Sequence, residues 1–264
     1  MHEDGAPETA RLVRTIKHSA HDSVCHHPEG LDRDPSAHAG NGLAPTPSFS
    51  RVVCEYVDDE QEPGPQGPRG GACWSSYQKL DKWTRSPAVD LPAVDARAVR
   101  THAELEAQLV ALAHDDLSDT LLSIETHGTE HVPGAPWEFA LDDIDFHGPR
   151  DWPLLSGGAT PRLRPALALI GGCFAGTPEG RACVEACLAD GVAYVASTRV
   201  TRAGQLSGRV LPAVLRASST NLPLGGVDSD DEGTLNGMLA LPYGATNTRP
   251  AWTAWRAYVA GAGR

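Results

Sequence analysis

The stretch Ala166-Leu-Ala-Leu-Ile-Gly-Gly-Cys-Phe-Ala-Gly176 is an apolar run of strand length that ends in glycines around one cysteine, Cys173. A second such stretch, Leu121-Leu-Ser-Ile-Glu-Thr-His-Gly128, ends in His127 and Gly128. Apolar runs closed by turn residues are typical of buried strands in a parallel sheet. Because reactive groups gather beyond the carboxyl ends of such strands, we expect His127 and Cys173 to share one edge of a sheet. An imidazole beside a thiol is the minimum that a cysteine nucleophile with its base requires.

Signals for helices alternate with these strands. Thr101-His-Ala-Glu104 is a capping-box pattern that opens a helix, and Thr177-Pro178 supplies an N-cap and a first-turn proline for another. A further helix is expected from about 203 to 217, kinked at Pro212. Strands are expected at 51–57, 96–100, 121–128, 166–171 and 192–197, with a short hairpin around 137–141. This alternation predicts an α/β fold with a mostly parallel central sheet and helices on both faces.

The overall composition narrows the class of protein. The 264 residues suffice for one large domain, and the net charge of -12 argues against a nucleic acid or an anionic membrane as partner. No run of about 18 apolar residues predicts a membrane span. The acidic first residues lack the apolar core of a signal peptide, and the six cysteines show no secreted disulfide pattern. We therefore expect a cytoplasmic location.

The composition also divides the chain. Residues 1–46 are rich in His, Asp, Pro, Gly and Ala, which predicts a flexible or loosely docked extension before a domain spanning 47–264. The extension carries a cluster that could bind zinc: His18, His21, Cys25, His26 and His27. Because no second pair of ligands follows at a zinc-site spacing, we favour a polar tail and expect neither metal nor cofactor.

Two other groups of reactive side chains have plain interpretations. Cys183 and Cys187 are four positions apart on an expected helix, whereas a redox pair has two intervening residues, so we interpret them as small buried residues. The run Asp228-Ser-Asp-Asp-Glu232 lacks the ordered spacing of an EF-hand loop. A solvated acidic loop is the preferred interpretation of that run.

In chain order, the motifs resemble the caspase-like clan of cysteine proteases and, within it, the CHAT domains. His127-Gly128 is similar to the clan's histidine motif, and Gly172-Cys173-Phe-Ala-Gly176 is similar to its cysteine motif. The segments 190–197 and 255–261 are similar to a later strand and to the C-terminal motif of CHAT domains. The resemblance covers roughly residues 48 to 261. It implies a three-layer caspase-like sandwich and a cysteine endopeptidase.

The expected mechanism uses few groups. His127 accepts the Cys173 proton, the thiolate forms an acyl-enzyme, and His127 protonates the leaving amine. The main-chain N–H groups of Gly128 and Cys173 are the candidate oxyanion donors, and a glycine at 128 would leave room for substrate. Glu125 is expected to point away from His127 or along the strand, so it is not expected to orient the imidazole.

The resemblance also bears on substrates. Relatives that cut after basic residues have an aspartate two residues before the cysteine, where this chain has Gly171. Ser197-Thr198-Arg199 is similar to the caspase segment that holds an acidic side chain, which makes Ser197 and Arg199 candidate substrate-binding residues. The implied partners are a protein or peptide substrate and a regulatory protein, small-molecule activator or cleavage event.

Two other functions stay open. One is a catalytically inactive module that keeps the caspase-like fold and recognises a protein or small ligand. The other is a metal-dependent regulator that uses the N-terminal histidines and cysteine. Fold alone does not decide among these functions, because one architecture hosts many activities.

Overall fold

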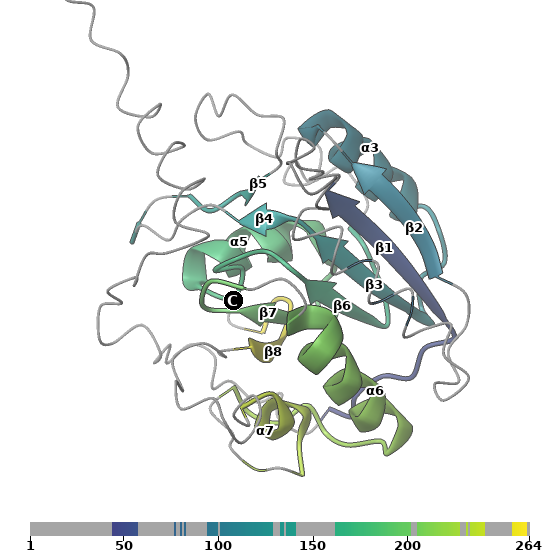
Figure 1. Cartoon of the computed structure of the whole chain (residues 1–264), viewed down its shortest axis with the longest axis vertical. Coiled ribbons are helices and arrows are strands. Elements are labelled where there is room, and N and C mark those ends of the chain that lie inside the picture. The colour runs from purple at the N-terminus through teal and green to yellow at the C-terminus, as the bar shows by residue number, and fades with distance from the viewer. Residues whose placement is uncertain are drawn as a thin grey trace, which may run out of the picture.

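A computed structural model describes residues 44–57, 77, 80, 82, 94–99, 101–128, 133–134, 136–140, 162–201, 205–227, 231, 233–240 and 255–262. The fold is α/β, and its main sheet has six strands in the order β2-β1-β3-β6-β7-β8 (Figure 1). Five of these strands are parallel, and β8 pairs antiparallel with β7. The strands are β1 (Arg51–Val57), β2 (Val94–Val99), β3 (Thr120–Glu125), β6 (Leu167–Ile170), β7 (Ala193–Ser197) and β8 (Trp255–Val259). The predicted mostly parallel sheet is confirmed.

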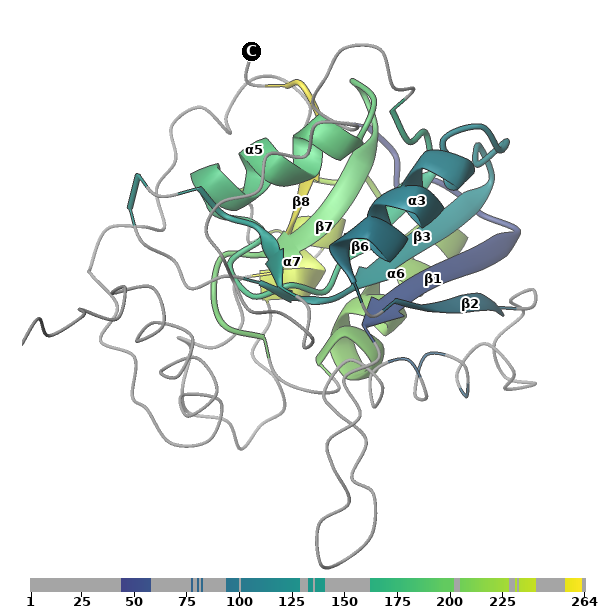
Figure 2. The ribbon, with the colours of Figure 1, turned by 90° about the horizontal axis from the view of Figure 1, so that it is seen from above.

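Helices cover both faces of this sheet (Figure 2). They are α3 (His102–Leu112), α5 (Pro178–Cys187), α6 (Leu211–Ser219) and α7 (Leu235–Ala240). Because side chains alternate along a strand, Leu122 and Ile124 of β3 pack on one face with α3 and α5. Leu121 faces the other way, into the core formed with α6 and α7. The residues of both core layers are buried, which fixes the register of the central strands.

The predicted helix starts at Thr101 and Thr177 are confirmed. The Thr101 hydroxyl accepts a hydrogen bond from the Glu104 N–H at 3.1 Å, and the Glu104 carboxylate accepts one from the Thr101 N–H at 3.3 Å. Thr177 accepts from the Gly180 N–H at 3.2 Å, with Pro178 in the first turn of α5. These caps satisfy N–H groups that the helices cannot bond internally.

Two predicted elements have different shapes. The helix expected from about 203 to 217 is helical without a break over 205–219, and Pro212 lies in the first turn of α6. The irregularity lies just before it, in a π-helical turn at Leu206–Val210. The strand expected at 121–128 is divided: β3 ends at Glu125, and His127–Gly128 form a separate strand, β4. Strand β4 pairs antiparallel with β5 (Phe139–Ala140). The hairpin predicted around 137–141 is therefore formed between β5 and the histidine segment.

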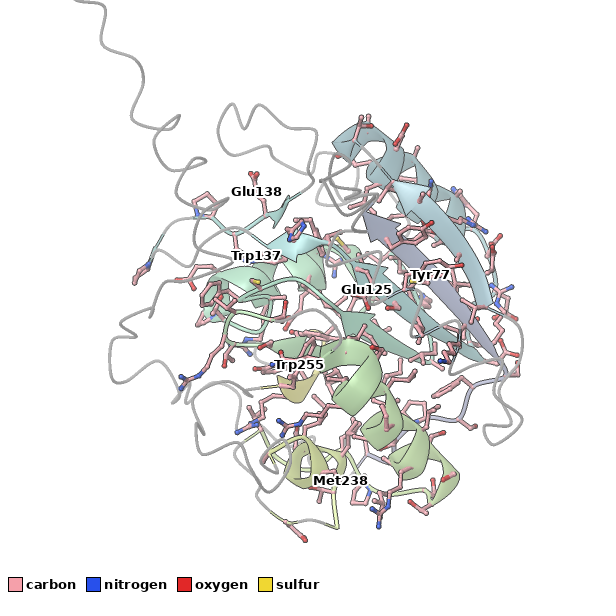
Figure 3. All side chains as sticks on the ribbon, in the orientation of Figure 1. Tyr77, Glu125, Trp137, Glu138, Met238 and Trp255 are labelled. Atoms are coloured by element: carbon pink, nitrogen blue, oxygen red, sulfur yellow. The ribbon has the colours of Figure 1, made fainter. Side chains whose placement is uncertain are left out.

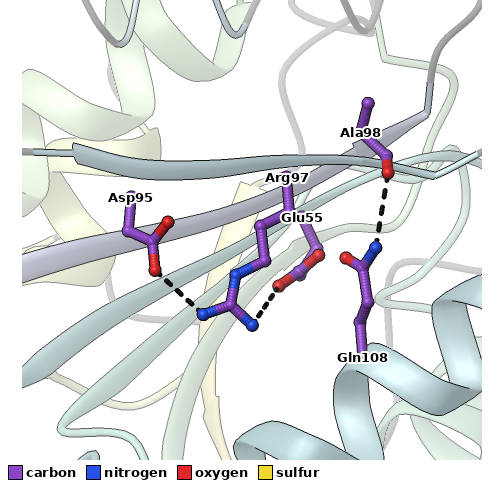
Figure 4. Close-up of polar contacts among 5 residues, drawn as sticks. All are labelled: Glu55, Asp95, Arg97, Ala98 and Gln108. Carbon is purple, nitrogen blue, oxygen red and sulfur yellow. Dashed lines mark hydrogen bonds and ion pairs between the residues drawn. The ribbon is translucent and has the colours of Figure 1, made fainter.

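A cluster of polar side chains, of which Glu55 is buried and Asp95 exposed, joins the edge strand β2 to β1 (Figure 4). The Glu55 carboxyl is 0% exposed and lies 3.8 Å from a guanidinium nitrogen of Arg97, which also bonds Asp95 at 2.9 Å. Gln108 of α3 donates to the Ala98 carbonyl at 3.4 Å. Burial raises the pKa of Glu55 from 4.5 to about 7, and Arg97 only partly opposes this rise. The Glu55 carboxyl is therefore expected to gain or lose its proton near neutral pH while the protein stays folded.

Some predictions concern parts of the chain that the structure describes only at their margins. Residues 1–43, with the histidine and cysteine cluster, lie outside the described residues, as does most of the acidic run 228–232. The end of the predicted extension pairs with the domain, because the Thr46 N–H donates to Leu222 O at 2.7 Å.

In the described ranges, no helix has the length and apolar character that crossing a membrane requires. The same ranges hold no group of three or more His, Cys, Asp or Glu side chains suited to a metal ion.

Candidate active site

The two motifs meet at one edge of the sheet. Strands β3 and β6 are parallel neighbours, with Ile124 opposite Ile170, so the segments that follow them leave the sheet side by side. A Cβ atom at Gly128 would lie 2.1 Å from the carbonyl oxygen and 2.9 Å from the nitrogen of Cys173. Only a glycine allows this approach. The space at Gly128 is thus filled by the Cys173 main chain, rather than left open for substrate as the sequence suggested.

Trp137, just before β5, holds this contact together. Its indole N–H donates to the Cys173 carbonyl oxygen at 2.8 Å, and its side chain is 4% exposed. The same ring borders Gly128 and Gly172, where an added Cβ would come within 2.8 and 3.1 Å of it (Figure 3). Sequence reasoning missed this residue. The one signal for it was a tryptophan in the connection between the two motifs.

The turn after Cys173 has an unusual backbone. Phe174 has a φ angle of 60°, a region that bulky residues rarely adopt. Three hydrogen bonds hold it: its N–H donates to Arg199 O at 3.0 Å, and its carbonyl accepts from the N–H and hydroxyl of Thr177 at 3.0 and 2.8 Å. Such strained residues cluster at functional sites, where the surrounding structure supports them. The N-cap of α5 therefore also shapes the cysteine turn.

Strand β8 supports the same turn from its other end. The Tyr258 hydroxyl donates to Gly176 O at 3.2 Å, and the Gly176 N–H donates to Ser197 O at 2.8 Å. The Arg181 guanidinium lies 5.2 Å from the centre of the Tyr258 ring, within the range of a cation–π contact. The turn from 173 to 176 is thus fixed by α5, β7 and β8 together.

The Cys173 side chain is partly exposed and contacts the loop after β7. Its sulfur accepts from the Thr201 N–H at 3.3 Å and lies 3.4 Å from the Thr201 hydroxyl oxygen. Within the described chain, all hydrogen bonds of this sulfur go to Thr201. Among the described residues, no main-chain hydrogen bond begins at the Cys173 N–H, and this nitrogen packs against Gly128. Sequence reasoning missed Thr201, because nothing local marks a threonine in a loop as a contact of the cysteine.

Three other cysteines are described, and all are free thiols. Burial raises the pKa of the Cys54 and Cys183 thiols well above the usual value and that of Cys187 to about 12. The Cys187 thiol donates to the Cys183 carbonyl at 3.5 Å, and both side chains pack against the core. These surroundings disfavour the thiolate, so none of the three is suited to be a nucleophile.

Glu125 occupies the space beside Gly171. Its side chain is buried on the α6 face of the sheet, and one oxygen accepts from the Ser123 hydroxyl at 3.3 Å. A Cβ atom at Gly171 would lie 2.5 Å from the other oxygen of this carboxylate. A carboxyl group therefore lies where a side chain at 171 would begin, but it comes from β3.

The candidate substrate-binding residues lie in the segment that follows β7. Ser197 is buried, and its hydroxyl accepts from the Arg199 N–H at 3.2 Å. The Arg199 carbonyl oxygen accepts a hydrogen bond from the Phe174 N–H, so the Arg199 main chain is fixed to the cysteine turn. Arg199 itself is partly exposed. Ser197 thus shapes the turn on which Arg199 lies.

The sequence matches no model of a known protein family, and no curated protein is significantly similar to it. The arrangement of the described residues therefore has to indicate the chemistry. That arrangement combines a partly exposed thiol with an imidazole-bearing strand whose glycine touches the thiol residue. Such groups suit acyl transfer.

Proposed function

We propose that this protein is a cysteine endopeptidase in which Cys173 is the nucleophile and His127 is the general base and acid. The observation that carries the proposal is the contact of Gly128 with the Cys173 main chain. This contact brings the end of the histidine strand against the cysteine turn. The two reactive residue types required for a thiol protease therefore come from adjoining strand tips.

A three-layer sandwich of the caspase-like clan, of the CHAT type, is the architecture that we propose for this domain. A mostly parallel sheet with helices on both faces supports it, as does the order of the histidine and cysteine motifs. The antiparallel last strand, β8, coincides with the segment that is similar to the C-terminal motif of CHAT domains. The Tyr258 hydroxyl of this strand bonds Gly176, which gives the segment a role in shaping the site.

The proposed reaction has two stages. His127 takes the Cys173 proton, and the thiolate adds to the peptide carbonyl. The N–H groups of Cys173 and Gly128 bind the resulting oxyanion, and the strained turn at Phe174 holds the Cys173 donor in place. His127 then gives its proton to the leaving amine, which leaves a thioester on Cys173. His127 next takes a proton from water, whose oxygen attacks the thioester and frees the acid and the thiol.

The proposed substrates are proteins or peptides. Arg199 is the proposed contact for an acidic side chain of the substrate, because its main chain is bonded to the turn that carries Cys173. Control by a partner protein, a small-molecule activator or a cleavage event belongs to the same proposal. It rests on the resemblance to the clan.

The test is incubation of the full chain with a mixed proteome, followed by labelling of newly formed protein N-termini. Wild type is compared with Cys173→Ala and with Cys183→Ala, which removes a thiol that lies outside the site. New termini from wild type and Cys183→Ala, but not from Cys173→Ala, are the expected result. Identical termini from all three proteins would refute the endopeptidase.

One observation favours a second function, a binding module without catalysis. The described hydrogen bonds of the Cys173 sulfur go to Thr201, in the loop after β7. In this alternative, the site recognises a protein or small ligand and the thiol is a structural contact. Retention of ligand binding in Cys173→Ala, together with an absence of new termini from wild type, would support it.

A further inference from the structure

Thr201 presents two donors to the Cys173 sulfur. Its main-chain N–H lies 3.3 Å from the sulfur, and its hydroxyl oxygen lies 3.4 Å from it. The same hydroxyl is 3.4 Å from the Gly171 carbonyl oxygen. One side chain therefore bridges Gly171, the residue that follows β6, and the Cys173 thiol.

The hydroxyl has one proton and two acceptors, so its bonding depends on the state of the sulfur. In the thiol form, the S–H can donate to the Thr201 carbonyl, 4.0 Å away, while the hydroxyl donates to Gly171 O. When the thiol proton passes to His127, the sulfur has only lone pairs. It then accepts from both the N–H and the hydroxyl of Thr201, and hydrogen bonds to a charged acceptor are stronger than neutral ones.

These donors are held in place before the reaction begins. The segment 197–201 is joined to the cysteine turn by the bonds Phe174 N–H to Arg199 O and Gly176 N–H to Ser197 O, at 3.0 and 2.8 Å. The Ser197 hydroxyl fixes the Arg199 N–H as well. Fixed donors stabilise charge without a cost of reorganisation, which makes them effective at a reacting atom.

We propose that Thr201 is a further catalytic residue, which stabilises the Cys173 thiolate through its hydroxyl and main-chain N–H. This inference deepens the proposed function and rests on it for its catalytic meaning. The contact with the sulfur, however, predicts a chemical property that is measurable without any peptide substrate.

The experiment measures the rate at which iodoacetamide alkylates Cys173 in the full chain, as a function of pH, by peptide mass spectrometry. Thr201→Val keeps the shape of the side chain and removes the hydroxyl, whereas Thr201→Ser restores it. Thr220→Val is the matched control, because its hydroxyl bonds the Arg216 carbonyl at the exposed end of α6. Thr201→Ala provides a second variant without the hydroxyl in case valine disturbs the fold, which thermal unfolding will show.

At pH 7, Thr201→Val and Thr201→Ala should slow alkylation of Cys173 about tenfold, the effect of losing one hydrogen bond to a charged group. The pH of half-maximal rate should rise in both. Thr201→Ser should return the rate to within about twofold of wild type, and Thr220→Val should leave it unchanged. Unchanged rates in both hydroxyl-free variants would overturn the inference. Faster alkylation would also overturn it, because the Thr201 contact would then lower the reactivity of the Cys173 sulfur.

The inference and the proposed function can fail separately. If Thr201→Val slows alkylation but the wild type produces no new termini in a proteome, the proposed endopeptidase activity is refuted, and the stabilising contact of Thr201 with the sulfur is supported. If proteolysis depends on Cys173, while the Thr201 variants cleave substrates and react with iodoacetamide at the wild-type rate, the role of Thr201 is refuted and the endopeptidase activity is supported.

Discussion

The indole N–H of Trp137 donates a 2.8 Å hydrogen bond to the main-chain carbonyl oxygen of Cys173. A residue from the β4–β5 hairpin thereby fixes the backbone of the cysteine, and its ring fills the space beside Gly128 and Gly172. This contact connects the histidine segment and the cysteine turn through side-chain packing as well as through the glycines.

Replacing Trp137 with phenylalanine should lower both stability and thiol reactivity. The Cys173 carbonyl loses its donor, which costs about 1–3 kcal/mol of unfolding free energy when the acceptor is buried. Trp255→Phe is the matched control, since the buried Trp255 N–H has no hydrogen-bond partner among the described residues. Urea unfolding of both variants measures the difference. Equal losses in the two would show that the Trp137 bond contributes nothing.

Gly128→Ala should disrupt the site. The added Cβ would lie 2.1 Å from Cys173 O, and relief of such a contact requires the backbone to move, at a cost of about 1–3 kcal/mol. Gly226→Ala, at an exposed position with no atom within 4 Å, should change stability by less than about 0.5 kcal/mol. Thermal unfolding and Cys173 alkylation report the two effects. A Gly128→Ala protein with wild-type stability and reactivity would contradict the packing described above.

Cys173 should react with iodoacetamide before Cys54, Cys183 and Cys187. Burial raises the pKa of each of those three thiols, so their thiolate fraction at neutral pH is small. His127→Ala should slow alkylation of Cys173 without altering the other three rates. Mass spectrometry of each cysteine-containing peptide over time provides the measurement. Similar rates at all four, unaffected by His127→Ala, would favour the binding module.

Glu55 should make stability depend on pH. Below pH 4.5 its carboxyl is protonated in both the folded and unfolded chain. Between about 4.5 and 7 the unfolded chain loses the proton while the folded chain keeps it, so the unfolding free energy falls as pH rises. The loss is complete above about pH 7 and amounts to about 3 kcal/mol.

Glu55→Gln should remove this dependence and stabilise the protein at pH 8 by about 1–3 kcal/mol. Glu106→Gln, which removes a carboxylate from a half-exposed position on α3, should leave the dependence in place. Urea unfolding at pH 5 and pH 8 gives the comparison. A Glu55→Gln protein whose stability still falls between these pH values as in wild type would contradict the assignment.

Arg199 and Glu125 lead to opposite expectations for a peptide-library cleavage profile. With Arg199 as the substrate contact, wild type should prefer an acidic residue next to the cut bond, and Arg199→Ala should lose this preference. Glu125→Gln should leave it in place, and Arg216→Ala controls for loss of a positive charge on the exposed side of α6. If wild type instead prefers basic residues and Glu125→Gln loses that preference, the Glu125 carboxyl beside Gly171, rather than Arg199, would be the substrate contact.

Local sequence determined the main elements of this protein. The apolar runs at 121–125 and 167–170, the cap at Thr101 and the Thr177-Pro178 start of α5 depend on neighbouring residues, so their signals are readable in the chain. The neighbouring course of β3 and β6, whose following segments carry His127 and Cys173, also followed from sequence, since parallel strands direct their carboxyl ends to the same edge.

Only the tertiary structure decided how the site is held. The Trp137 bond, the Thr201 contact with the sulfur and the Glu125 carboxyl over Gly171 each join residues from different elements. The positive φ of Phe174 likewise depends on partners in α5 and after β7. Such contacts leave no local pattern, because a side chain's partner across a fold is set by the packing of whole elements rather than by its neighbours in sequence.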